Sequence, residues 1–492
     1  MKFTDLVFPD SGNYWLTRLV FQRSLGVIYF IAFLCAINQF RPLLGEHGLL
    51  PVPLFVRQAS FRQTPSLFFF APKDWAFALA GWIGLALSVL TVTGIAERGA
   101  TWMNAVVWAA MWALYLSFVN VGQVFYAFGW ESILLEAGFF AIFLGARDVR
   151  PSLISIWLLR WLEFRIMFGA GLIKLRGDPC WRNLTCLDYH YETQPMPNPL
   201  SWYFQMAPEW THKAGVAFNH FSELIVPFFY FLPQPVASIA AAITIVFQAT
   251  IFASGNLSWL NALTIVLAIP AIDGRYISAL IPIRQPALNP PSIAHNAVLI
   301  ALAVLVGILS IDPVRNMLSP MQIMNTSFNP LHLVGTYGAF GSISRERYEV
   351  VVEGTSDAVI TPATQWKEYE FKGKPNDVRR MPPQIAPYHL RLDWLMWFAA
   401  MSRFEEHPWF LNFVAKLLEN NKPVLSLLRS NPFPDRAPRF VRAELYQYRF
   451  ARPEIHRRTG QWWVRTRVGP WFPEVSLENP AFKGLLQQEG WL

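Results

Sequence analysis

Residues 158–203 read LLRWLEFRIMFGAGLIKLRGDPCWRNLTCLDYHYETQPMPNPLSWY, and the interpretation of the whole chain starts from them. The first half is apolar and long enough to enter a membrane, yet it carries Arg160, Glu163, Arg165 and Lys174. Each ionisable group in hydrocarbon costs about 2.5–3.5 kcal/mol, so such groups are rarely without a role. On a helix, Arg160, Glu163 and Lys174 fall on one stripe, and Arg165 falls on the other side. The stretch therefore predicts a buried, charged seam.

Two glycines and two cysteines follow this seam. Gly169 and Gly171 allow another backbone to come close. Cys180 and Cys186 lie in an aromatic, proline-rich loop too polar for lipid, and their spacing fits neither a C-x-x-C redox motif nor a zinc pattern. We prefer a structural disulfide that closes a short loop, with two free thiols as the alternative. A disulfide would place this loop in an oxidising compartment.

The composition is that of an integral membrane protein. Of the 492 residues 53% are hydrophobic and only 15% are charged, against about 25% in soluble domains. Several apolar runs approach the length of about 20 residues that a membrane span requires. The net charge is +8, but no nucleic-acid reader motif occurs, so a solvated basic face near anionic lipid is the preferred explanation.

The sequence predicts a polytopic α-helical membrane protein of about nine spans, followed by an α+β soluble domain at the carboxyl end. The bundle takes up residues 1–324, with an interfacial segment at 41–74 and the cysteine loop at 176–214. The expected spans are Ser24–Phe40, Trp75–Ile95, Trp102–Phe125, Trp130–Ala146, Ser152–Leu175, Val216–Leu232, Val236–Ser254, Leu257–Ile272 and Ile293–Ile311. No removable signal peptide is expected at the amino terminus.

Residues 325–492 have the composition of a mixed soluble domain. Alternating patterns predict strands around Tyr348–Val352 and Trp366–Phe371, with a second pair of strands at 438–450 and 460–472. Leu392–Phe404 and Pro408–Leu428 read as helices. Lys and Arg are divided almost evenly between the two sides of the membrane, so they do not decide the orientation. The cysteine pair decides it: we expect the amino terminus inside and the carboxyl-terminal domain outside.

Common catalytic motifs are absent from the sequence, including G-x-S-x-G, H-E-x-x-H, the P-loop and G-x-G-x-x-G. His220 and Glu223 lie three residues apart and share a helix face. Without a third ligand they are expected to form a polar pair rather than a metal site. No metal and no cofactor is predicted.

The membrane charges allow two interpretations. In the first, Glu131, Glu136, Arg160, Glu163 and Lys174 neutralise each other and hold helices together. In the second, a buried and partly desolvated Lys174 acts as a base or contacts a substrate. Glu131 and Glu136 are about 140° apart on a helix, so they do not form a carboxylate pair by themselves.

Long stretches of the chain resemble the lipase maturation factor family. They are NQFRPLLGEHGLLP (38–51), FGWESILLEAGFFAIFLG (128–145), RIMFGAGLIKLRGDPCWRNLTCLDYHYETQPMPNPLSWYF (165–204), NPLHLVGTYGAFGSISRERYEVVVEG (329–354) and APYHLRLDWLMWFAA (386–400). The resemblance implies a polytopic membrane protein with a luminal or outer tail. Animal members of the family reside in the endoplasmic reticulum and help dimeric secreted lipases to reach their active form. Because the chain closes without a retrieval signal, a bacterial inner-membrane member is expected, with an endoplasmic reticulum protein as the alternative.

A more distant similarity concerns mechanism. FGAGLIKL (168–175) is similar to the lysine-bearing segment of vitamin K-dependent gamma-glutamyl carboxylases, which implies Lys174 as the matching catalytic base. Where those enzymes carry a histidine motif, this chain has GWES (129–132), with Glu131 at the matching position. This departure argues against carboxylase activity itself and leaves a shared membrane-embedded fold.

The leading functional hypothesis is a membrane-bound maturation factor that assists exported client proteins, lipases by resemblance. The tail and the loop Asp178–Tyr203 would present aromatic and basic surface to a partly folded client, with Trp462, Trp463 and Trp471 as candidates. The alternative is a membrane-embedded enzyme that uses Lys174, with Glu131, on a lipid-soluble substrate. The expected partners are the lipid bilayer and exported proteins, and no nucleic acid.

Overall fold

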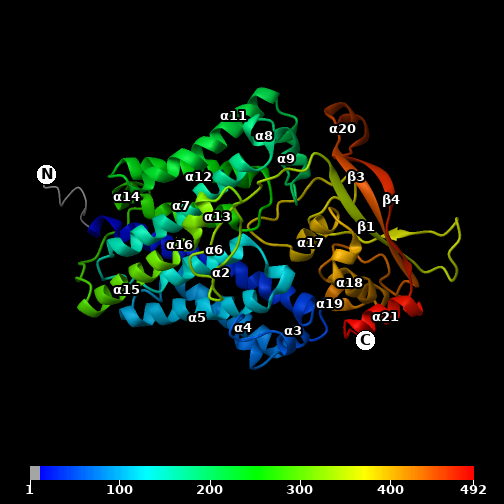
Figure 1. Ribbon diagram of the computed structural model, residues 1–492, viewed down its shortest axis with the longest axis horizontal. Coiled ribbons are helices and arrows are strands. Elements are labelled where there is room, and N and C mark those ends of the chain that lie inside the picture. Colours follow the sequence, from blue (N-terminus) through cyan, green and yellow to red (C-terminus); the bar gives the residue numbers. More distant parts are fainter. Residues whose placement is uncertain (1–10, 492) are drawn as a thin grey trace.

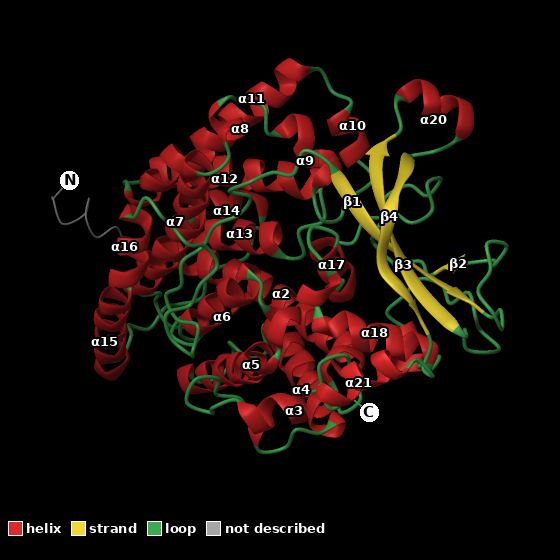
Figure 2. Ribbon diagram, turned by 45° about the vertical axis from the view of Figure 1, so that its right-hand side comes forward, coloured by secondary structure: helices red, strands yellow, loops and turns green. Residues whose placement is uncertain are grey.

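The computed structural model describes residues 11–491, with helices gathered on one side and an antiparallel sheet on the other (Figure 1). The long apolar helices of the bundle are α2 (Trp15–Leu44), α4 (Asp74–Val92), α5 (Thr101–Val121), α12 (Val236–Ser254) and α15 (Ile293–Leu309), which α16 (Ile311–Leu318) continues. Figure 2 shows α15 at the edge of the bundle, away from the sheet.

The remaining helices of the bundle are shorter or, like α7, carry charged side chains. They are α3 (Val52–Gln58), α6 (Gly129–Ala141), α7 (Leu153–Arg176), α8 (Pro179–Arg182), α9 (Leu187–Thr193), α10 (Ser201–Gln205), α11 (Glu209–His220), α13 (Leu260–Ala268) and α14 (Gly274–Leu280). Short 3-10 helices occur at Ser11–Tyr14, Leu67–Phe69, Gln123–Tyr126, Val226–Phe231 and Ile269–Ala271, and a π-helical turn occurs at Phe221–Ile225. Between the end of α2 at Leu44 and the start of α4 at Asp74, the predicted interfacial segment 41–74 contains only α3 and one 3-10 turn.

The predicted number of about nine spans is not confirmed. Within residues 11–491, five helices are long and apolar enough to cross a membrane, or six if α13 and α14, bent by 117°, form one broken span. Helix α6 has only 13 residues, against the roughly 20 needed to cross the hydrocarbon. The predicted span 216–232 is interrupted by the π turn and by Pro227, which cannot continue a regular helix. Helix α7 is 24 residues long but carries the four charged side chains of the seam.

The carboxyl-terminal segment combines a small sheet with short helices. The strands are β1 (Arg347–Thr355), β2 (Lys367–Glu368), β3 (Phe440–Phe450) and β4 (Trp463–Val475), and the helices are α17 (Arg391–Ala399), α18 (Pro408–Leu418), α19 (Lys422–Leu425), α20 (Pro453–Thr459) and α21 (Pro480–Gln488), with a 3-10 turn at Phe404–Glu406. The sheet order is β2-β1-β3-β4, and each neighbouring pair is antiparallel. All four predicted strands are therefore present, although β2 is much shorter than expected.

The predicted helix Pro408–Leu428 is divided into α18 and α19. Asn420 adopts a left-handed conformation with φ of 52°, which ends α18. The side chain of Asn421 then accepts a hydrogen bond from the backbone N–H of Val424 over 3.2 Å and begins α19.

The carboxyl-terminal segment packs directly on the bundle. Near the end of α2, Gln39 donates to the His389 carbonyl over 2.6 Å and accepts from the Arg391 backbone N–H over 3.0 Å. One hydrophobic core contains Phe40 of α2 as well as Trp394 of α17. The amino-terminal end of α2 lies at the far side of the bundle from the sheet (Figure 1). The domain boundary at residue 325 stays a prediction.

Candidate functional site

Lys174 lies near the end of α7 that faces the carboxyl-terminal segment. Its side chain is 5% exposed, and its ammonium donates to Glu223 Oε1 over 2.6 Å and to Asn219 Oδ1 over 2.8 Å. Asn219 in turn donates to the other oxygen of Glu223 over 3.0 Å. The ring centroid of Trp181 lies 5.0 Å from Nζ. The charge of the lysine is thus compensated inside the protein.

Two glycines of α7 explain how these partners come so close. A Cβ atom at Gly171 would lie 2.7 Å from Leu224 Cδ2 and 3.0 Å from the Cβ of Glu223, so glycine leaves the space in which the π turn packs. A Cβ atom at Gly169 would lie 2.5 Å from the Tyr337 carbonyl oxygen. The close approach of another backbone, predicted from these glycines, therefore occurs at Gly169, while Gly171 admits a side chain. π-Helical turns are frequent at functional sites.

The five charged groups predicted to neutralise each other do not form one network, and that prediction was wrong. Lys174 pairs with Glu223, which lies outside the predicted set. Glu136 forms an ion pair with Arg165 and accepts from the Tyr337 hydroxyl over 2.7 Å. Helical periodicity gives the face of a side chain but not the element packed against that face.

Arg160 and Glu163 share a stripe of α7 but do not pair. Arg160 donates to the carbonyls of Pro270 and Tyr230, each over 3.1 Å, and to the Tyr14 hydroxyl over 2.9 Å. Glu163 is buried, and neither of its oxygens has a hydrogen-bond partner among the described residues. Two carbonyl groups and a hydroxyl, rather than a carboxylate, therefore accept the guanidinium hydrogen bonds of Arg160.

Glu131 pairs with Arg391 of α17, a residue 260 positions away in the sequence. Arg391 Nη1 lies 2.7 Å from Glu131 Oε1, and both side chains are fully buried. The hydroxyl of Tyr115 donates to Glu131 Oε2, and His389 Nδ1 lies 3.8 Å from Oε1. Burial lowers the pKa of His389 to about 4, and the charge of Arg391 acts in the same direction. The neutral imidazole packs among the rings of Phe128, Trp130, Trp259 and Trp394.

The predicted pairing of His220 with Glu223 was also wrong. His220 Nε2 lies 3.0 Å from the carbonyl oxygen of Trp181, while Glu223 binds Lys174. The π turn begins directly after His220, so the two side chains approach different elements. Within residues 11–491 no group of three or more His, Cys, Asp or Glu side chains is arranged to hold a metal ion.

Cys180 and Cys186 are joined in a disulfide, as the sequence predicts, with their Cα atoms 4.8 Å apart. Both cysteines are buried in a small apolar cluster that includes Trp181 and Ile343. Asp178, just before the loop, forms an ion pair of 2.7 Å with Arg345. The loop is therefore attached to the segment that leads into β1.

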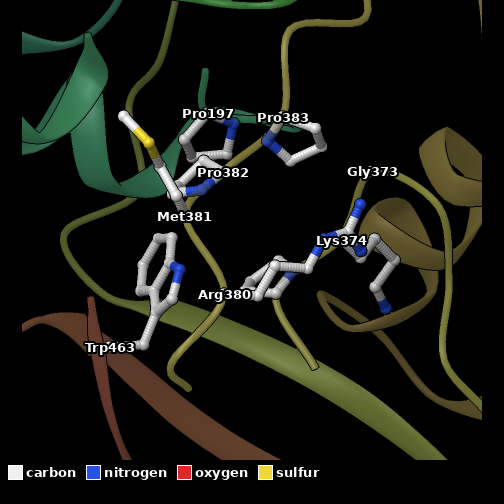
Figure 3. A pocket seen from close by; sticks show the side chains of 9 residues that line it. Pro197, Gly373, Lys374, Arg380, Met381, Pro382, Pro383 and Trp463 are labelled. Carbon is white, nitrogen blue, oxygen red and sulfur yellow. The ribbon is translucent and has the colours of Figure 1, made fainter. Parts of the chain in front are cut away.

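Of the three tryptophans predicted to face a client, Trp463 is buried, which corrects the prediction. Figure 3 shows its indole facing Pro197, Met381 and Pro382, around a space of about 10 Å³. That is room for about one water molecule at most. Trp471 is partly buried and donates to the Ser402 carbonyl over 3.0 Å. Trp462 is also partly buried.

A cavity of about 440 Å³ borders the Lys174 site. Lys174, Asn219 and Glu223 lie on its wall, together with Phe128 and Trp130 from the start of α6. Phe128 and Trp130 thus share the cavity wall with the Lys174–Glu223 pair, and Glu131, the partner of Arg391, directly follows Trp130.

Sequence reasoning missed Arg391, Asn219 and Tyr337 as partners of the buried charges. A signal was present for Arg391, because it stands in the apolar run YHLRLDWLMWF, where a charge requires a partner. Asn219 precedes Glu223 by one helical turn, and this spacing could have indicated their contact. The sequence carries no comparable signal for Tyr337.

Both the bundle and the carboxyl-terminal segment match models of a known protein family. Family models described as "Lipase maturation factor transmembrane domain" and "Lipase maturation factor C-terminal domain" match residues 16–279 and 333–473. The chain is 44% identical to lipase maturation factor 1 of Bos taurus, over 98% of this chain and 92% of that protein. It is 44% identical to lipase maturation factor 1 of Homo sapiens, over 98% of this chain and 91% of that protein. It is 29% identical to lipase maturation factor 2 of Xenopus laevis, over 97% of this chain and 85% of that protein. No solved structure matches the chain. The buried lysine of α7, the disulfide loop and the sheet packed on the bundle are thus features of an integral membrane protein that belongs to the lipase maturation factor family.

Proposed function

We propose that this protein is a membrane-bound maturation factor that assists the folding or assembly of exported proteins, with lipases as clients. The observation that carries the proposal is the similarity, over 98% of the chain, to proteins named lipase maturation factor 1. The same name favours maturation over the hypothesis of an enzyme that uses Lys174. The absence of common catalytic motifs points the same way.

The disulfide loop and the sheet together offer a surface for a partly folded client. Hydrogen bonds between side chains of the loop and the backbone of the sheet region join them: the Trp202 indole donates to the Ala451 carbonyl over 2.8 Å, and the Glu192 carboxylate accepts from the Phe450 backbone N–H over 2.7 Å. The two elements are therefore joined by direct hydrogen bonds. Figure 2 shows α10 and α20 near the same end of the sheet.

An aromatic cluster lies at this junction and consists of Trp202, Tyr203, His456 and Trp462. The ring centroids are 5.1 Å apart for Trp202 and Tyr203, 5.6 Å for Trp202 and Trp462, and 4.2 Å for His456 and Trp462. Tyr203 is 53% exposed. Aromatic side chains with one wet edge are enriched at protein interfaces, so we assign the client contact to this cluster.

Helix α20, which carries His456, adds positive charge beside the cluster. Arg457 and Arg458 are exposed there. Arginine is also enriched at interfaces, and a basic rim speeds the encounter with an acidic partner. We therefore expect clients with acidic segments beside an exposed apolar patch.

The test is maturation of a secreted lipase in cells that lack their own maturation factor. The secreted lipase activity per unit of lipase protein should rise when the full-length chain is expressed. The double variant Tyr203→Ala/Trp462→Ala should reduce this gain at matched expression. Trp366→Ala is the control, because Trp366 is also partly buried but lies at the opposite end of the sheet. Equal gains from all three proteins would exclude the cluster, and no gain from the unmodified protein would refute the function.

Lys174→Met separates maturation from catalysis. The single variant leaves Glu223 buried without its cation, which costs about 3–5 kcal/mol. The double variant Lys174→Met/Glu223→Gln avoids this penalty and should retain lipase maturation once its amount is matched. Loss of maturation in a folded double variant would instead support a chemical role for the lysine.

We further propose that the disulfide loop and the carboxyl-terminal segment lie on the outer or luminal side of the membrane. The support is the disulfide itself, since such bonds persist in oxidising compartments. Protease added to sealed right-side-out bacterial vesicles should digest the carboxyl-terminal segment. Protease added to the outside of sealed microsomes should leave it intact, because the segment would lie in the lumen. A carboxyl-terminal segment digested from the cytoplasmic side would refute this orientation.

A further inference from the structure

The cavity beside Lys174 has the size and lining of a small-molecule site. It lies between α7, α11, α12 and α13 on one side and α17 on the other. Its volume of about 440 Å³ falls within the roughly 300–1,000 Å³ usual for ligand pockets. Buried side chains form most of its wall, among them Trp130, Met167, Phe247, Leu257 and Trp394. Such a wall favours an apolar chain.

The acidic and basic groups on the wall carry no net charge. They are Lys174, Glu223 and His190. Lys174 and Glu223 compensate each other over 2.6 Å. Burial lowers the pKa of His190 to about 4, and the positive charge of Lys174 acts in the same direction, so the imidazole is neutral at pH 7. An ionised ligand would bring an uncompensated charge into this wall, which is unfavourable.

Two polar groups on the wall are left without strong partners. The side chain of Asn261 is buried, and among the described residues no donor reaches its Oδ1. Gln248 accepts from Asn261 Nδ2 over 2.7 Å, but its own Nε2 meets only the sulfur of Met167, a weak acceptor, at 3.2 Å. Lys174 donates to two described acceptors and has three hydrogens to give. A ligand hydroxyl could donate to the free acceptor, Asn261 Oδ1, and a ligand carbonyl oxygen could accept from a free donor such as the third hydrogen of Lys174.

We propose that this cavity binds an uncharged lipid with one acyl chain and a hydroxylated ester head, the class to which monoacylglycerols belong. The acyl chain lies against the apolar wall. A hydroxyl of the head donates to Asn261 Oδ1, and the ester carbonyl accepts from Lys174. Because the protein is an integral membrane protein, such lipids are present in the bilayer around it. The site does not depend on the client surface proposed above.

The test uses three photoreactive probes with the same diazirine-bearing oleoyl chain: 1-oleoylglycerol, oleate and lysophosphatidylcholine. The full-length protein is reconstituted in phosphatidylcholine nanodiscs, illuminated with each probe and digested, and labelled peptides are identified by mass spectrometry. Unlabelled 1-oleoylglycerol serves as competitor. Ala170→Phe fills the cavity, because Ala170 is buried on its wall. Ala217→Phe is the matched control, since Ala217 is exposed on α11 and does not line the cavity.

The glycerol probe should label peptides of α7, α12 and α13, with competition by unlabelled lipid, and more strongly than the other two probes. Ala170→Phe should abolish this labelling and Ala217→Phe should leave it unchanged. Asn261→Leu removes one hydrogen bond at similar volume and should weaken binding about three- to tenfold. Equal or stronger labelling by oleate or lysophosphatidylcholine would overturn the proposal. So would unaltered labelling in Asn261→Leu, which decides the matter even where Ala170→Phe does not fold.

Discussion

Replacing Glu131 with Gln removes one partner of the buried ion pair between α6 and α17. Arg391 would keep its hydrogen bond to the Phe125 carbonyl, 2.7 Å, and its contact with the ring of Tyr126, 3.4 Å from its centroid, but would lose its counter-charge. Removing one partner of a fully buried pair costs about 3–5 kcal/mol, because the remaining charge is left uncompensated. Arg391→Met should cost a similar amount, since it leaves the carboxylate of Glu131 without its cation.

The double variant Glu131→Gln/Arg391→Met shows whether the two side chains stabilise the protein through their mutual interaction or independently of each other. If the two groups compensate each other, the double variant should lose about 1–3 kcal/mol less than the sum of the single variants. The free energy of unfolding can be measured in mixed micelles by tryptophan fluorescence. Trp259 and Trp394 are useful reporters, because both pack around His389, the neighbour of this pair.

A surface pair provides the matched control. Glu209 and Lys213 are 2.7 Å apart on α11, with side chains 66% and 49% exposed. The same double-variant cycle on this pair should give a coupling of only about 0.3–0.5 kcal/mol. If the Glu131–Arg391 cycle gives no more than this control, the claim that the pair fixes the carboxyl-terminal segment on the bundle is refuted.

Three further predictions concern the loop and the carboxyl-terminal segment. Cys180→Ser/Cys186→Ser should lower the free energy of unfolding by about 2 kcal/mol, because the unfolded chain gains entropy when the short loop is no longer closed. Amide hydrogen exchange across α8 and α9 should accelerate, and unchanged exchange would contradict a stabilising role of the disulfide. Burial raises the pKa of Asp393 from 3.8 to about 6. The folded state therefore holds a proton that the unfolded state has released, so stability falls by about 2 kcal/mol as the pH rises from 4 to 6, and Asp393→Asn should remove this slope in unfolding measurements. Trp463→Ala should cost about 3–5 kcal/mol, whereas Trp462→Ala should cost far less and act on client maturation instead.

Local patterns in the sequence were sufficient for much of the fold. Alternation placed β1 and the short β2, and the second predicted pair of strands, 438–450 and 460–472, corresponds to β3 and β4. Uninterrupted apolar runs placed α2, α4, α5 and α12. The predicted span 216–232 failed, although Pro227 and the polar group around Glu223 were visible in the sequence. A hydrophobic count alone does not weigh a proline against the apolar residues around it.

Trp462 and Trp463 are adjacent in the predicted strand 460–472, although β4 itself begins at Trp463. Consecutive residues of a strand point to opposite faces, so Trp462 and Trp463 cannot both face a client. The structure buries Trp463 beneath Pro197 and Met381 and leaves Trp462 partly open. Which of the two is buried depends on the sheet order β2-β1-β3-β4 and on the loop above it, and neither can be read from the strand itself.

The partners of the buried charges were beyond the reach of such patterns. Arg391 is 260 positions from Glu131, and Glu223 meets Lys174 only because a π turn follows α11. Such pairs depend on the packing of segments distant in the sequence, whereas helical periodicity indicates only on which face of a helix a side chain lies. The general expectation that these membrane charges are shielded from solvent was sound, but the assignment of each to its partner was not.

The position of these pairs constrains how a maturation factor of this kind can work. Separation of α17 from α6 would leave Glu131 and Arg391 unpaired in an apolar environment, at the cost estimated above. The carboxyl-terminal segment is therefore expected to stay attached to the bundle throughout a client cycle, and a client cannot compete for the interface that holds it. The contact must then lie on surface that is already exposed, such as Tyr203 and the arginines of α20, beside the partly buried Trp462. A maturation factor built in this way offers its client a fixed platform held at the membrane.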